Sequence, residues 1–309
     1  MTPPSSRGDK FYFQCAVIIV GVIGTAANAL IIYALVASKQ HKKHVLIVNQ
    51  NALDLFSSFF MVVTYSLKLC NIHLTGSVGY WLCTLVLSES LIWCGTYGSV
   101  ISLASITVER YLKVVHPVWS KKKLRNWMIY ATAAFSWIGS FIINAAMLFP
   151  TTAVIDGVCH PYTFWANETY LTIYVIWTLV SFYVIILLIF IFCYWRILIV
   201  IRRQARVMAG YNDAAGPSTA QTTTVNQIQT NVIKTMIFVS AFYAVSWLPH
   251  YVYGSLFLYP NEITGVGGYY AVTSISFLYT CTNPFVYALK FEPVKQVLLR
   301  LILCKKTSE

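Results

Sequence analysis

Long blocks of apolar residues separated by short polar gaps dominate the hydrophobic pattern of this chain. Each block is long enough to cross the roughly 30 Å hydrocarbon core of a bilayer as a helix, which satisfies its own backbone hydrogen bonds. The third and fifth blocks are long enough to require tilt or to extend beyond the membrane. The pattern predicts seven spans, at about residues 11–38, 45–70, 81–115, 127–149, 169–201, 231–258 and 269–289.

Polar residues interrupt several of these blocks. Asn28 falls within the first span, and Asp54 lies deep in the second. Such groups are stable in hydrocarbon only when they face other helices or a wet interior. We therefore expect an all-α membrane protein whose seven transmembrane helices form one bundle, 11–289, with a polar interior. Because an ionisable group at the depth of Asp54 is costly in a membrane, we expect this residue to have a functional role.

Two shorter segments flank the predicted bundle. Residues 1–10 form an extracellular N-terminal tail, and residues 290–309 form a cytoplasmic tail. The second of these contains leucines and an isoleucine at 298–303 opposite lysines and an arginine, which predicts a short amphipathic eighth helix on the inner leaflet. Cys304, at its end, is a candidate for palmitoylation, and an unmodified thiol is the alternative.

Composition and charge agree with a membrane protein. Apolar residues make up 58% of the 309 positions and the mean hydropathy is +0.65, too apolar for the surface of a water-soluble globule of this size. With the N-terminus outside, most Lys and Arg fall in cytoplasmic segments, and the outer face has only Arg7, Lys10 and Lys68. The net charge of +12 then mostly reflects the basic residues that keep these segments on the cytoplasmic side. We therefore expect the protein to contact membrane lipid rather than nucleic acid.

The predicted outer face carries candidate covalent modifications. Cys83, at the mouth of the third span, and Cys159, in the loop after the fourth, both lie in an oxidising compartment, and we predict a disulfide between them. Two free thiols are the alternative, because sequence does not prove connectivity. Asn167 begins an Asn-Glu-Thr sequon in the same loop and is a candidate for glycosylation.

Taken in order, polar and proline-containing landmarks of the spans resemble those of the rhodopsin-like (class A) G-protein-coupled receptors. The resemblance covers nearly the whole chain. The matching landmarks are Asn28, Asp54, Glu109-Arg110-Tyr111, Trp137, Tyr194, Trp247-Leu248-Pro249 and Asn283-Pro284-Phe285-Val286-Tyr287.

The resemblance implies a plasma-membrane receptor that activates a heterotrimeric G protein, with arrestin as a further cytoplasmic partner. In such receptors Glu109 would neutralise Arg110 at rest, and activation would expose Arg110 to the G protein alongside Tyr194 and Tyr287. A permanent Glu109–Arg110 salt bridge that only anchors the helix end is the alternative. The kinks at Pro249 and Pro284 would let the sixth and seventh helices bend between two packings.

An internal sodium site is the only cofactor that the resemblance implies. Asp54, Ser99 and Asn283 would supply its ligands beneath Trp247, and hard oxygen ligands suit this ion. Tyr279 stands where the family often has a smaller amide, which leaves the remaining ligands open. A proton on Asp54 is the alternative.

The chain also departs from the family pattern. The fifth span has no proline, with Ile186 at the usual place, and Tyr243 replaces a phenylalanine four residues before Trp247. We therefore expect the switch at mid-membrane to be built differently. Cys83 precedes Arg110 by 27 residues, longer than is common, which indicates a bulge in the outer third helix or a higher cysteine. Gln229 stands where many members have an acid that clasps the arginine, so high basal signalling is expected.

The ligand pocket predicted from the resemblance is aromatic and weakly polar. The position that carries the aspartate of amine receptors is Ile92 or Ser90, depending on the direction of counting, which disfavours an ordinary monoamine receptor. Glu89 could serve as an amine counter-ion instead, or could pair with Lys68. The remaining candidate lining residues are Trp93, Tyr97, Trp247, His250, Tyr251, Tyr253, Tyr269, Tyr270 and Phe277.

This lining suits the aromatic or C-terminal group of a peptide slightly better than a small aromatic molecule. A retinal Schiff base is excluded, because Phe277 occupies the position of the required lysine. A seven-helix transporter would need more ionisable residues along the bundle than Asp54 and Glu89. We do not expect an enzyme, because no H-E-x-x-H, paired-acid or Ser/His/Asp set occurs at catalytic spacing.

Overall fold

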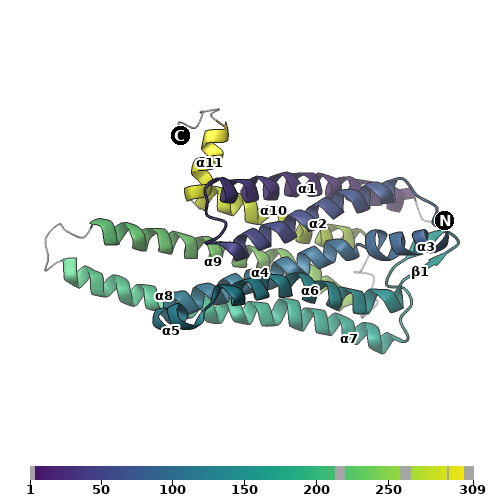
Figure 1. Ribbon diagram of the computed structural model, residues 1–309. Helices are drawn as coiled ribbons and strands as arrows, with labels where there is room; N and C mark the ends of the chain where they lie inside the picture. The colour runs from purple at the N-terminus through teal and green to yellow at the C-terminus, as the bar shows by residue number, and fades with distance from the viewer. Residues whose placement is uncertain (1–3, 213–219, 258–265, 291, 303–309) are drawn as a thin grey trace.

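The computed structural model describes residues 4–212, 220–257, 266–290 and 292–302, and Figure 1 shows an elongated helical bundle. The predicted Cys304 site lies outside these residues. Among the described residues, seven long helical rods cross the bundle, as the apolar pattern predicts. The elements of these rods are α1 (Pro4–Ala37), α2 (Val45–Leu69), α3 (Gly76–Trp81) with η1 (Leu82–Leu87) and α4 (Ser90–Val115), α6 (Asn126–Thr151), α7 (Glu168–Leu179) with η2 (Val180–Val184) and α8 (Ile185–Asn212), α9 (Ala220–Phe257), and α10 (Val266–Lys290).

Five of the rods are, in the part of the chain that the structure covers, long and apolar enough on their own to cross a membrane. They are the first five in chain order, ending with Glu168–Gln204. α9 and α10 pack against each other, and α10 also packs against α1, so these two rods close the bundle. The first helix begins at Pro4, inside the segment predicted as a tail. A proline suits the first turn of a helix, where a backbone N–H has no partner in any case.

The rod that contains α4 lies at the centre of the bundle. It packs against α2, α6 and α8, and most of its outer half is buried. Small residues allow close approach elsewhere: a Cβ added to Gly24 of α1 would come within 2.4 Å of the Ser58 hydroxyl on α2. The amide of Asn28 donates to the main-chain carbonyl of Thr280 at 3.0 Å and so joins α1 to α10.

A two-stranded hairpin covers one end of the bundle, near α3 and the N-terminus (Figure 1). Strand β1 (Ala153–Ile155) pairs antiparallel with β2 (Val158–His160). The two turn residues, Asp156 and Gly157, both have positive φ, at 50° and 74°, as a tight hairpin turn requires. Gly157 also accepts a hydrogen bond from the Leu74 amide at 2.9 Å, and a Cβ there would strike the His73 ring. The hairpin is therefore fixed to the loop after α2.

Two short helices lie at the opposite end. α5 (Pro117–Lys123) follows α4 directly, and α11 (Glu292–Ile302) turns away from the bundle axis after α10 (Figure 1). Val294 of α11 is fully buried, and Val297 and Leu298 pack against the core, whereas Arg300 is exposed. This spacing of three and four residues is the apolar stripe of an amphipathic helix, which agrees with the predicted eighth helix.

Candidate functional site

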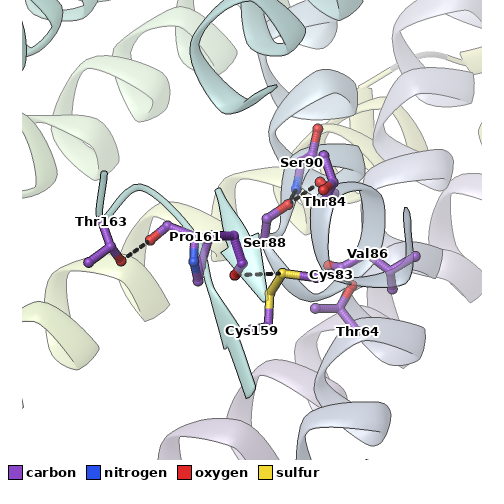
Figure 2. The surroundings of a disulfide bond; sticks show 10 residues. Thr64, Cys83, Thr84, Val86, Ser88, Ser90, Cys159, Pro161 and Thr163 are labelled. Carbon is purple, nitrogen blue, oxygen red and sulfur yellow. Dashed lines mark hydrogen bonds between the residues drawn. A yellow bond between two sulfur atoms is a disulfide. The ribbon is translucent and has the colours of Figure 1, made fainter. Parts of the chain in front are cut away.

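The predicted disulfide is present between Cys83 in η1 and Cys159 in β2 (Figure 2). It joins the third rod to the hairpin. The third rod does not run straight beyond it: η1 has π-helical geometry, and Glu89 interrupts the helix with a φ of 67°. These two irregularities accommodate the extra residues between Cys83 and Arg110. They correspond to the bulge predicted for the outer part of this rod.

Glu89 is already paired. Its Oε1 accepts hydrogen bonds from the Lys68 ammonium at 2.5 Å and from the Tyr65 hydroxyl at 2.7 Å. The Lys68 ammonium also lies 4.7 Å from the centre of the Tyr65 ring. The sequence left two roles open for Glu89, a counter-ion for an amine ligand or an ion pair with Lys68. In the structure Glu89 pairs with Lys68. An amine ligand would have to displace that lysine to use the carboxylate as its counter-ion, which weakens the amine-receptor alternative.

Two cavities open at this end of the bundle, on either side of Tyr269. The outer cavity, of about 400 Å³, has the Lys68–Glu89 pair and Tyr270 in its wall. The inner cavity, of about 330 Å³, is lined by five predicted ligand residues: Trp93, Tyr97, His250, Tyr251 and Tyr269. Both volumes lie near the lower end of the range of ligand pockets, and the shared wall at Tyr269 would let one extended ligand reach both.

Sequence reasoning missed part of the inner cavity. Asn144 of α6, Tyr162 and Trp165 of the outer loop, and Tyr174 and Thr178 of α7 also line it. The loop aromatics are the one signal that was available, since exposed-loop positions have no packing reason to be aromatic. Which helix faces point inward there depends on tertiary packing.

Trp247 and Phe277 lie beneath the inner cavity rather than in its wall. They are 1% and 0% exposed, and each packs at an angle against the Trp93 ring, with ring centres 6.1 and 5.7 Å away. Their prediction as ligand contacts is wrong for this conformation. They form a floor beneath the inner cavity, with Trp247 contributed by α9 and Phe277 by α10.

The fifth rod and the sixth are joined by tyrosines at the same level. The hydroxyl of Tyr243 on α9 donates to the main-chain carbonyl of Phe182 in η2, and the hydroxyl of Tyr183 donates to the carbonyl of Ala244 at 2.9 Å. A π-helical turn leaves a carbonyl without its ordinary partner. The fifth rod thus has an irregular segment although it lacks the proline, and Tyr243 supplies a donor that a phenylalanine could not.

Polar atoms without partners converge below this floor. Asp54 Oδ2 accepts a hydrogen bond from the amide of Asn283 at 2.7 Å. Ser99 lies beside the Asp54 carboxyl, and Tyr279 beside Ser99 and Asn283. Within the described residues, the buried oxygens that lack a hydrogen-bond partner here are Asp54 Oδ1, Ser99 Oγ, Tyr279 OH and Asn283 Oδ1. A carboxylate with three neutral oxygens matches the donor set of a small hard cation, so the residues fit sodium.

The cytoplasmic end differs from the predicted latch. Glu109 forms its ion pair with Lys113, one helical turn further along α4. Residues i and i+4 face each other on a helix, whereas neighbours such as Glu109 and Arg110 do not. The guanidinium of Arg110 instead lies 3.1 Å, from Nη2 to Nδ1, from the imidazole of His44. The prediction that Glu109 neutralises Arg110 directly is therefore wrong for this conformation.

The two tyrosines expected beside Arg110 have other partners. The hydroxyl of Tyr194 lies 3.0 Å from both the Thr107 and the Ser240 hydroxyls, which ties α8 to α4 and α9. The hydroxyl of Tyr287 donates to Gln50 at 3.0 Å, which ties α10 to α2. Both rings are buried, so these contacts hold the inner ends of the helices together. Tyr111 points elsewhere, with its hydroxyl 3.3 Å from His116.

Asn167, the predicted glycosylation site, caps α7. Its side-chain oxygen accepts a hydrogen bond from the Tyr170 amide at 3.0 Å, and the residue is exposed. A glycan attaches to the side-chain nitrogen, so the capping oxygen and modification are compatible.

Comparison with known proteins gives a consistent result. The family model described as "7 transmembrane receptor (rhodopsin family)" matches residues 27–287. Somatostatin receptor type 5 of Bos taurus is 24% identical over 97% of this chain and 78% of its own length. Galanin receptor type 1 of Rattus norvegicus is 24% identical over 94% of this chain and 82% of its own length. The crystal structure of squid rhodopsin superimposes with a TM-score of 0.77 at 17% identity, covering 100% of this chain and 90% of that one.

Proposed function

Because the chain belongs to the rhodopsin family of seven-transmembrane receptors, which are not enzymes, we propose that it binds an extracellular peptide and activates a heterotrimeric G protein. As a multi-pass membrane protein of this family, it would act at the plasma membrane with its N-terminus outside. An epitope tag at the N-terminus should then bind antibody on intact cells, whereas a C-terminal tag should require permeabilisation.

One observation carries the proposal: a continuous column of buried groups connects the outer cavities to Arg110. Trp93 in the cavity wall packs edge-to-face on Trp247, and Trp247 contacts Tyr279, with ring centres 6.4 Å apart. Tyr279 borders the Asp54–Asn283 cluster, below which Tyr287 and Arg110 follow. A ligand that moves Trp93 would therefore act on α9 and α10, both of which contain a proline kink.

The preference for a peptide rests on the shape and charge of the outer end. An aromatic inner cavity and an outer cavity with adjacent positive and negative side chains suit a ligand with separate aromatic and charged groups, as peptides have. The somatostatin and galanin receptors among its relatives are peptide receptors, and they favour the same class.

The coupling proposal is tested by Arg110→Ala. We expect the variant to reach the cell surface and to lose stimulation of nucleotide exchange in a panel of purified heterotrimeric G proteins. The matched control is Arg125→Ala, since Arg125 is an exposed arginine at the same end of the bundle and makes no side-chain cap to α6. Undiminished exchange by Arg110→Ala would contradict the proposal.

The ligand class is tested by screening peptide and amine libraries on cells that express the chain. A peptide response that is lost in Trp93→Ala or Lys68→Ala would support the proposed site. Activation by amines alone, sensitive to Glu89→Gln, would replace the peptide with an amine ligand.

A further inference from the structure

Arg110 makes its one side-chain hydrogen bond among the described residues with the residue that caps the start of α2. The partner is His44, which lies 3.1 Å away and is 8% exposed. The backbone of His44 is fixed at the start of α2: its N–H donates to Gln40, and its carbonyl accepts from Ile47 and Val48, all at 3.0–3.1 Å. The imidazole is therefore presented to Arg110 by a rigid turn rather than by a loose loop.

The direction of this hydrogen bond follows from chemistry. A guanidinium has only donors, so Nδ1 of His44 must be the acceptor and its proton must be on Nε2. Burial, together with the positive charges of Arg110, Lys43 and Lys113, lowers the pKa of His44 to about 3. The imidazole is thus neutral at cytosolic pH and can act as an acceptor throughout.

Glu109 is not available for this role. Its carboxylate, 10% exposed, is engaged by the ammonium of Lys113. A carboxylate would hold the guanidinium more strongly than a neutral ring does, because charge-assisted hydrogen bonds with two ionised partners are the stronger class. In addition, Arg110 Nε is buried and has no hydrogen-bond partner within the described part of the chain. The neutral His44 ring therefore restrains the Arg110 guanidinium less strongly than a carboxylate would.

From these contacts we propose that His44 is the positioning residue that restrains Arg110 in the resting receptor, in the place of Glu109. The inference rests on the proposed role of Arg110 in G-protein activation. His44 stabilises the conformation in which the guanidinium points toward α2, and a G protein that binds Arg110 must break this single hydrogen bond.

The experiment measures basal nucleotide exchange by the full-length receptor in lipid nanodiscs, without ligand, using the G protein that gives the highest signal. His44→Leu removes the acceptor, and we expect basal exchange to rise roughly three- to tenfold. His44→Gln provides a new acceptor oxygen and should stay near the wild type. His41→Leu, a histidine in the same turn whose Nδ1 makes no hydrogen bond to any described residue, is the matched control and should change nothing.

A second variant leaves His44 intact. Lys113→Met releases Glu109 but leaves the His44–Arg110 hydrogen bond in place, and because adjacent residues do not face each other on a helix, we expect basal exchange to stay near the wild type. Lys113 is 39% exposed, so this change should not impair folding.

The outcomes separate the inference from the function on which it rests. If Arg110→Ala still stimulates exchange, the proposed function fails. If Arg110→Ala is inactive but His44→Leu, present at wild-type surface levels, has unchanged basal exchange, the inference alone is overturned. An increase that His44→Gln and His41→Leu share would also overturn it, since it would reflect a general loosening of this turn.

Discussion

The hydroxyl of Tyr243 on α9 donates a hydrogen bond to the main-chain carbonyl of Phe182 on the neighbouring rod. Phe182 lies in the π-helical segment η2, and Tyr243 is fully buried. Phe182 supplies a carbonyl in the π-helical turn, and Tyr243 supplies the hydroxyl that donates to it. Two departures from the family pattern, the missing proline of the fifth span and the tyrosine in the sixth, therefore belong to one contact.

Tyr243→Phe should lower stability. The change keeps the ring and removes the hydroxyl, which leaves the Phe182 carbonyl buried without its donor at a cost of about 1–3 kcal/mol. Thermal unfolding of the purified receptor measures the loss. Tyr33→Phe, at a tyrosine that is 54% exposed on α1, is the control and should unfold like the wild type. Equal stability of all three proteins would mean that the contact contributes nothing.

Sodium should stabilise the receptor through Asp54. At a sodium concentration of about ten times the dissociation constant, binding to the folded state adds about 1.4 kcal/mol. We expect the wild type to unfold at a higher temperature in sodium chloride than in choline chloride at equal ionic strength. Asp54→Asn, which retains the size but not the charge, should remove the difference. A sodium effect that persists in this variant would place the ion elsewhere.

Loss of the disulfide should prevent normal surface expression. Cys83 and Cys159 are 76 residues apart. A crosslink that closes a loop of this length lowers the entropy of the unfolded chain and so stabilises the folded state by about 4 kcal/mol. Cys83→Ser and Cys159→Ser should therefore have the same severe effect, and the double variant should be no worse than either. Cys70→Ser is the control, since Cys70 is an exposed free thiol on the same face.

Acid should destabilise the receptor through His44. Its pKa in the folded state, about 3, is below the ordinary value of 6.5, so its contribution is complete above pH 6.5 and is lost progressively as the pH falls toward 3. The charged groups that face it, Arg110, Lys43 and Lys113, are all positive and oppose protonation. Between about pH 7.5 and pH 5.5 the wild type should lose about 1 kcal/mol more than His44→Gln. Parallel pH profiles of the two proteins would contradict this.

The amino-acid sequence by itself determined the class of fold and the positions of the rods. Apolar blocks of membrane-spanning length can satisfy their backbones only as helices, so the spans, the inner amphipathic helix and the polar interior at Asn28 and Asp54 follow from local pattern. The bond between Cys83 and Cys159 followed from their shared location on the outer face.

Tertiary structure alone decided which polar groups meet. Glu89 could await a ligand or pair with Lys68, and only the rotation of the helices and the break at Glu89 select Lys68. His44 and Arg110 are 66 residues apart, and no periodicity in either segment relates them. A helical pattern specifies which face of a helix is polar, but the packing of the neighbouring helix determines which side chain meets that face.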